Sequence, residues 1–78
     1  MRYFFHTADG SRDRDETGTE LPDYDAARKQ AVMFAGEYMA DNPGVVADRK
    51  DFRVEVTDDR NLLLFTVIAV AVPARRLQ

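Results

Sequence analysis

Apolar and polar residues alternate along the chain in a way that predicts two strand pairs flanking one helix. Residues 2–7 have the period of a strand, with Tyr3 and Phe5 on one side. Asp9-Gly10 supplies turn chemistry. The polar stretch Arg12–Leu21 then predicts a short or irregular second strand that returns against the first, because its acids and glycine are poor strand formers.

The next segment has the spacing of an amphipathic helix from about Tyr24 to Asp41. Asp23 is a suitable N-cap because its carboxylate accepts from a free backbone N–H of the first turn. Pro43 cannot continue the helix. At 100° per residue one arc collects the aromatic and small side chains, namely Tyr24, Ala27, Ala31, Phe34, Ala35, Tyr38 and Met39. Alanines at the centre of this arc allow the helix to sit close to a sheet, and Met33 points outward.

The rest of the chain predicts a loop over Val45–Lys50, a strand over Phe52–Thr57, a hairpin turn at 58–61, and a last strand over Leu62–Val72 that Pro73 stops. We therefore predict an α+β fold of two layers, a small antiparallel β-sheet with one α-helix packed on one face, in ββαββ order. Residues 1–78 form a single small α+β domain, and residues 74–78 form a frayed tail.

The last strand is apolar on both faces. One face carries Leu62, Leu64, Thr66, Ile68, Val70 and Val72, and the other carries Leu63, Phe65, Val67, Ala69 and Ala71. One helix covers only one face of a sheet, and a strand of this length reaches roughly 36 Å, against about 27 Å for the helix. We therefore expect self-association, either face to face or by edge pairing across a two-fold axis, through Leu63, Phe65, Val67, Ile68, Val70 and Val72. The alternative is that Val45, Val46 and Leu77 fold over the second face.

Composition narrows the classes of function. The chain has 78 residues, 32% of them charged, a net charge of −3, one histidine and no cysteine. This length allows one small domain, and the residue types exclude a disulfide, a thiolate nucleophile and a multi-histidine metal site within one chain. Nucleic-acid binders normally carry the opposite charge, so we expect no nucleic-acid binding by the monomer. The longest apolar run falls short of the ~20 residues of a membrane helix, so we expect a cytoplasmic protein with no membrane partner.

An acidic segment spans residues 9–25, where acids outnumber arginines. Its candidate partner-facing residues are Asp13, Asp15, Glu16 and Glu20, which a basic partner could contact. The alternative, which we favour, is a solvated turn rich in aspartate. Asp13, Asp15 and Thr17 also match the opening of an EF-hand loop, but Tyr24 stands where the bidentate glutamate belongs, so calcium binding there would be weak.

His6 is the one candidate for acid–base chemistry. A general base needs a partner carboxylate and an orienting shell, and Asp15 or Glu16 approaches His6 if the first two strands pair. Such a carboxylate would raise the pKa of His6. We favour a structural histidine half-buried beside an acid. Ser11 lies in a turn without an elbow motif, and the chain has no Gly-rich phosphate loop. We therefore expect no enzymatic activity, no cofactor and no metal.

Several short stretches resemble a family of small stand-alone bacterial proteins, domain of unknown function 6894. The matching stretches are Tyr3-Phe4-Phe5-His6, Asp15-Glu-Thr-Gly18-Thr-Glu20-Leu21-Pro22-Asp23, Ala26-Ala27-Arg28 and Val54-Glu55-Val56-Thr57-Asp58. Their order and spacing agree over roughly residues 2–67. The resemblance implies no activity, because the role of the family is not established. The residues that carry it look structural, so it implies no catalytic residue. The chain departs from the family pattern at Phe65–Val72, which is longer and more apolar.

A weaker likeness, in general layout only, is to HicB-type antitoxins, in which short strands lead through a Leu-Pro-Asp turn into an Ala-rich helix; fold alone does not give function. The leading hypothesis is a non-catalytic homodimeric protein-interaction domain. The alternative is an antitoxin-like regulatory module that binds a basic partner through residues 9–25. A small metal-dependent enzyme using His6 with Asp13 and Asp15 is the least favoured.

Overall fold

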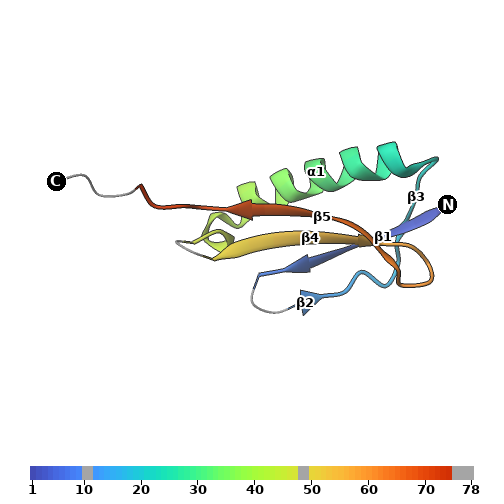
Figure 1. Ribbon diagram of the computed structural model, residues 1–78, viewed down its shortest axis with the longest axis horizontal. Coiled ribbons are helices and arrows are strands. Elements are labelled where there is room, and N and C mark those ends of the chain that lie inside the picture. Colours follow the sequence, from blue (N-terminus) through green and yellow to red (C-terminus); the bar gives the residue numbers. More distant parts are fainter. Residues whose placement is uncertain (10–11, 48–49, 75–78) are drawn as a thin grey trace.

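In the computed structural model, which describes residues 1–9, 12–47 and 50–74, one helix packs on one face of an antiparallel sheet (Figure 1). The elements in chain order are β1 (Arg2–Ala8), β2 (Arg12–Asp13), β3 (Thr19–Glu20), α1 (Tyr24–Asp41), the 3₁₀ turn η1 (Pro43–Val45), β4 (Asp51–Thr57) and β5 (Leu63–Val70). The predicted α+β class is confirmed. Of the expected frayed tail, residues 75–78 lie outside the described part of the chain.

The sheet is organised around β1. β4 pairs with one side of β1, and β5 lies beyond β4, giving the order β2-β1-β4-β5. On the other side of β1, β2 pairs with its C-terminal end and β3 with its N-terminal end. The expected second strand is thus two short strands, because the chain arches away between them through Gly18, whose φ is 77°. The predicted ββαββ order holds only approximately.

The helix is fitted to the sheet by its small residues. Ala27, Ala31 and Ala35 are buried, as the alanine stripe predicted, and they face a sheet layer in which Val54 and Val56 are fully enclosed. A side chain larger than alanine at the centre of α1 would hold the two layers apart. At the start of α1 the expected cap is present, since the Ala26 N–H donates to Asp23 Oδ1 at 2.9 Å.

The last strand is shorter than the sequence suggested. β5 has 8 residues, which spans roughly 27 Å and matches the length of α1, so the expected overhang was wrong. Leu62 belongs to the turn instead, because its N–H donates to Asp58 Oδ1 at 3.0 Å and its carbonyl accepts from the Asp58 N–H at 3.1 Å.

A register shift decides which β5 residues share a face. Val56 pairs with Phe65, but Thr57 pairs with Leu63, so alternation is interrupted between them. Leu63 therefore joins the face opposite the helix, and Leu64 packs against the core. The expectation that Leu63 shares a face with Phe65 was wrong. Val45 and Val46 also pack against the core, whereas Leu77 lies outside the described residues.

Two glycines give a matched test of the backbone. Gly18→Ala places a Cβ 2.8 Å from Arg2 Cγ and 2.9 Å from Phe4 Cε2 at a positive φ, so we expect a loss of about 1–3 kcal/mol in the free energy of unfolding. Gly36→Ala meets nothing within 4 Å in the interior of α1, so we expect a gain of about 0.5–1 kcal/mol. Urea denaturation measures both, and equal effects at the two positions would contradict this account.

Candidate interaction surface

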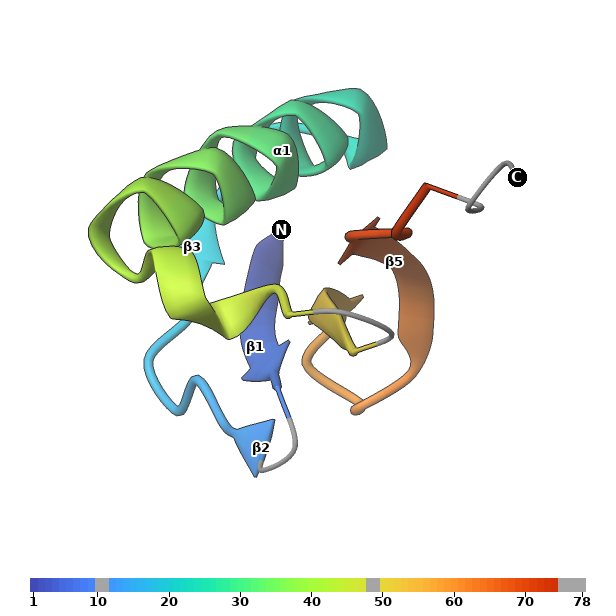
Figure 2. The same cartoon turned by 90° about the vertical axis from the view of Figure 1, so that its left-hand side faces the viewer.

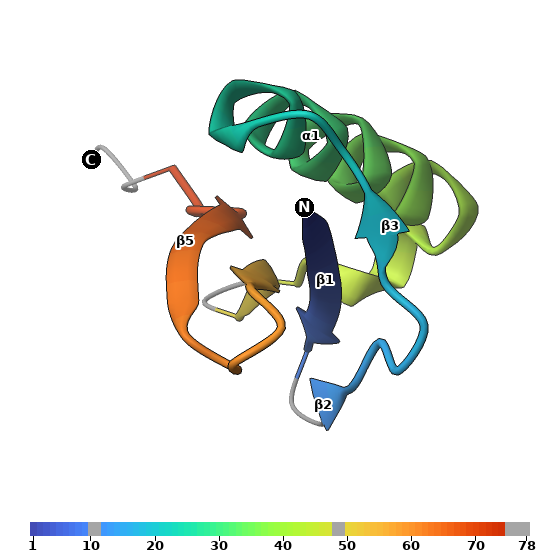
Figure 3. The same cartoon turned by 90° about the vertical axis from the view of Figure 1, so that its right-hand side faces the viewer.

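The β5 residues of the predicted self-association set divide between the two faces of the sheet. Phe65 and Val67 are partly buried and pack on the helix side. On the opposite, outer face the exposed side chains are Leu63 at 53%, Ile68 at 54%, Val70 at 52% and, just beyond the strand, Val72 at 79%. We call these four residues the β5 strip. Figures 2 and 3 show that α1 lies on one face of the curved sheet. On the opposite face His6 and Thr57 of the β1–β4 ladder are buried, whereas the β5 strip is exposed.

β5 is also an edge strand. In the described part of the chain its backbone has a strand partner only on the β4 side. Soluble proteins normally protect such an edge with a charge, a proline or a covering segment, yet β5 reads LLFTVIAV and has neither a charge nor a proline. The result is an apolar strand with one free row of backbone hydrogen-bonding groups.

The opposite edge of the sheet is protected. β2 and β3 pair with the ends of β1, and between them the Asp15 carboxylate accepts from the Phe5 N–H at 3.2 Å. A side chain thus takes the place of a strand at the middle of β1. Within the described residues, one edge of the sheet is covered and the other has no strand partner.

Polar pairs border the β5 strip on β4. Arg53 and Asp51 form an ion pair at 2.9 Å, and they align with Ile68 and Val70 across the ladder. Glu55, one step along the same face, pairs with Arg12 of β2 at 3.1 Å. The outer face is therefore apolar along β5 and charged along β4, which is the layout of an interface with a polar rim.

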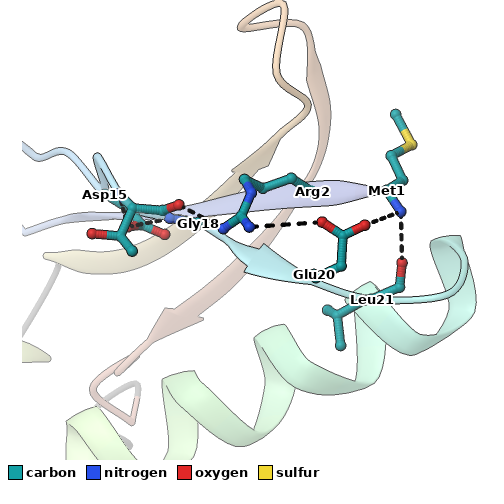
Figure 4. A network of polar contacts seen from close by, with 7 residues as sticks. Met1, Arg2, Asp15, Gly18, Glu20 and Leu21 are labelled. Carbon is teal, nitrogen blue, oxygen red and sulfur yellow. Dashed lines mark hydrogen bonds and ion pairs between the residues drawn. The ribbon is translucent and has the colours of Figure 1, made fainter.

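Two of the four acidic candidates are engaged within the chain (Figure 4). Glu20 accepts from the Met1 ammonium at 2.7 Å and lies 3.8 Å from Arg2. The hydrogen bond from the ammonium is the main reason that the pKa of Glu20 lies below its ordinary value. Its carboxylate serves chiefly to hold the start of β1 beside β3.

Asp15 is the second engaged carboxylate. Burial alone would raise its pKa, but N–H groups of Gly18, Phe5 and Thr17 donate to it at 3.0, 3.2 and 3.0 Å and together hold the pKa below its ordinary value. With these donors satisfied, Asp15 has a structural role. Asp13 and Glu16 are exposed and form no ion pair within the described residues.

Metal ligands do not gather in the described part of the chain, where no group of three acidic or histidine side chains is placed to hold an ion. The EF-hand-like segment illustrates the reason. The Asp15 oxygens face backbone N–H groups, so they are turned away from any site shared with Asp13.

His6 sits in a closed polar network. Its side chain is 2% exposed, its Nδ1 accepts from the Asp15 N–H at 3.0 Å, and its Nε2 lies 2.9 Å from Thr57 Oγ1. The Asp15 bond requires an unprotonated Nδ1, so Nε2 carries the proton and donates to Thr57. In this tautomer His6 cannot accept the Thr57 hydroxyl proton as a general base.

The pKa of His6 is lowered, first by burial and then by the nearby charges of Arg12 and Arg14; Asp15 and Glu55 oppose the shift. The expectation that a neighbouring carboxylate raises this pKa holds for Asp15 and Glu55, but burial and the two arginines outweigh them. Asp15 lies beside His6, as the sequence suggested. The group of Asp15 that hydrogen-bonds to the imidazole ring is its backbone N–H and not its carboxylate.

Sequence reasoning also missed two buried polar residues, Thr57 and Asp58. Asp58 Oδ1 accepts from the Arg60 N–H at 2.8 Å and the Leu62 N–H at 3.0 Å, which shapes the turn between β4 and β5. An aspartate at the first position of a turn is the signal that could have indicated this role.

These features define a small α+β domain whose sheet carries a helix on one face and, in its described part, has one unpaired apolar edge strand. The model of the family described as domain of unknown function 6894 matches residues 2–71, and the chain belongs to that family. Neither the curated proteins nor the solved structures compared with it gave a match.

Among the described residues, no helix combines the length and apolarity that crossing a membrane requires.

The lowered pKa of His6 predicts that the protein loses stability as the pH falls. Because the folded state binds this proton less readily than the unfolded chain, whose histidine titrates at about 6.5, stability is full above that pH and falls as the pH drops toward the folded-state pKa. Urea denaturation between pH 7.5 and 5.5 should show this fall, and His6→Gln should remove most of it.

His6 is the one histidine of the chain, so its ring signals in an NMR titration are unambiguous even if the variant does not fold. A midpoint above 6.5 in the folded protein would contradict the prediction.

Proposed function

We propose that this protein is a non-catalytic interaction domain that works as a homodimer, joined by antiparallel pairing of β5 with β5 of a second copy. The observation that supports this most is the uncharged edge strand with its exposed apolar strip. Edge pairing of this kind uses main-chain hydrogen bonds for affinity and side-chain rows for specificity.

A second copy is the partner that matches β5 best. Antiparallel pairing about a two-fold axis makes the same strand both donor and acceptor, and eight residues supply about eight inter-strand hydrogen bonds. Since β5 has no charged residue, no like charges meet across the axis. The pairing would turn two sheets into one continuous sheet.

The pairing would also bury side chains on both faces. On the outer face the two β5 strips would adjoin, with the Arg53–Asp51 ion pair of each copy at the rim. On the helix face Phe65 and Val67 would approach the copy beside Tyr24, whose ring contacts Phe65 at 5.2 Å and is half exposed. All six predicted self-association residues, Leu63, Phe65, Val67, Ile68, Val70 and Val72, thus belong to one interface.

Light scattering after size exclusion tests the dimer at low and high salt. The wild-type protein should have twice the chain mass of 8.9 kDa and should resist salt, because the contact is apolar. Ile68→Asp should give a folded monomer, since it places a charge in the strip. Met33→Asp, at an exposed apolar position of α1, should remain dimeric.

Val67→Asp is the contrasting variant. Val67 pairs with the fully enclosed Val54, so a carboxylate there should lower the free energy of unfolding by about 2–3 kcal/mol. A wild-type monomer throughout the micromolar range, or a monomer from Met33→Asp, would overturn the proposal.

Cysteine cross-linking tests the geometry, because the chain has no cysteine of its own. With the two-fold axis at Ile68, which lies between the outer-face positions Thr66 and Val70, Ile68→Cys meets its own copy across the pairing and should form a covalent dimer under mild oxidation. Met33→Cys, equally exposed on α1, should not. Cross-linking that is equal at both positions would indicate random collision, not β5 pairing.

The alternative of an antitoxin-like module that binds a basic partner through the acidic segment has less support. Glu20 and Asp15 are occupied by groups of their own chain, which leaves Asp13 and Glu16 as the free carboxylates of the four.

A further inference from the structure

A cleft of about 430 Å³ lies between α1 and the segment that contains β2 and β3. It exists because β2 and β3 pair only with the two ends of β1, so the chain between them stands off from the sheet. Phe5 of β1 and Phe34 and Tyr38 of α1 line it, together with polar side chains that include Thr7, Asp13 and Gln30. The cleft is at the opposite edge of the sheet from β5.

The aromatic wall is held in place by packing. The Tyr38 ring stacks on Phe52 with centroids 5.0 Å apart and meets Phe34 edge to face at 6.1 Å. Because the core fixes Tyr38 from behind, the ring arrangement is already formed before any ligand arrives. Aromatic faces of this kind attract organic cations.

Thr7 contributes a hydroxyl to the lining of the cleft. Its side chain is only 7% exposed, yet none of the hydrogen bonds among the described residues uses Thr7 Oγ1. Fully enclosed side-chain oxygens and nitrogens in this part of the chain all have partners. Thr7 Oγ1 is therefore not one of these fully enclosed atoms, and because Thr7 lines the cleft, a ligand donor bound there could reach it.

The charge of the cleft favours a cation. Two carboxylates, Asp13 and Asp15, line it against one guanidinium, that of Arg14. The Asp15 oxygens are taken by backbone donors, so Asp13 is the carboxylate that remains free to accept a hydrogen bond from a ligand.

We propose that this cleft binds a guanidinium group, with its plane against one ring of the Phe34–Tyr38 pair and its N–H groups donating to Asp13 and to Thr7 Oγ1. A guanidinium combines a flat face for stacking with donors that point in several directions, which matches a site having an aromatic wall, a carboxylate and a buried hydroxyl. The proposal does not depend on β5 pairing, because the two sites share no residue.

The probe is Nα-acetyl-L-arginine amide, followed by amide chemical shifts in NMR, with Nα-acetyl-L-citrulline amide as its neutral isostere. The arginine probe should saturate shifts at Phe5, Thr7, Gln30, Phe34 and Tyr38, and the citrulline probe should not. Asp13→Asn removes one charge pair at a partly exposed site, so it should weaken binding of the arginine probe roughly threefold to fivefold. Glu16→Gln, in the same acidic segment but outside the cleft lining, should bind as the wild type does.

Two further variants distinguish a built site from general attraction to an acidic protein. Arg14→Gln should tighten binding because it removes the repelling charge, and Thr7→Val should weaken it without changing the net charge. Equal shifts with citrulline, equal losses in Asp13→Asn and Glu16→Gln, or shifts that do not saturate would overturn the proposal.

The source of the guanidinium is distinguished by a second pair of probes. Agmatine represents a free small molecule, and a blocked tripeptide with a central arginine represents a protein side chain. Both should occupy the cleft; tighter binding of agmatine assigns the site to a small molecule, and tighter binding of the tripeptide assigns it to a protein partner.

Discussion

A single helix can cover only one face of a sheet, and the rest of this structure depends on that constraint. The alanine stripe of α1 brings the helix backbone close to β4 and β5, and the enclosed valines of β4 complete a thin core. Within the described residues, no segment covers the β5 strip or continues the sheet beyond β5. In a domain this small the core has little stability to spare, so the placement of each apolar side chain matters.

Asp15 is the polar counterpart of that core. Its carboxylate closes the open stretch of β1, holds Gly18 in its turn, and places its own N–H on His6. One residue thereby protects an edge, selects the histidine tautomer and makes the chain stand off from the sheet. The cleft beside α1 is a consequence of the same geometry, because the segment that Asp15 holds forms one of its walls.

The two edges of the sheet therefore have different chemistry. The β1 edge is covered by β2 and β3, and the cleft with its charged side chains lies beside it, so this edge suits a polar ligand. The β5 edge has no strand partner among the described residues and carries no charge, so it suits another strand. A dimer through β5 would leave both copies of the cleft accessible on the far sides of the extended sheet, so the two proposed activities are compatible in one assembly.

The sequence by itself determined the elements whose signals are local. The helix from Tyr24 to Asp41, its Asp23 cap, the alanine stripe and the alternation of β4 were all predicted, because capping and periodicity are properties of neighbouring residues. The resemblance to the family was also carried by local stretches of residues, and it was confirmed.

Only the tertiary structure decided what depends on pairing between distant segments. The register shift opposite Val56 moved Leu63 to the outer face, and no pattern within β5 reveals a shift that its partner strand imposes. The sequence also did not reveal which carboxylates are engaged within the chain. Asp15 and Glu20 accept hydrogen bonds from groups at or next to β1, which lie far from them in the sequence. The direction of the His6 pKa followed from enclosure by the whole fold, because desolvation is set by every segment that surrounds the ring and by none alone.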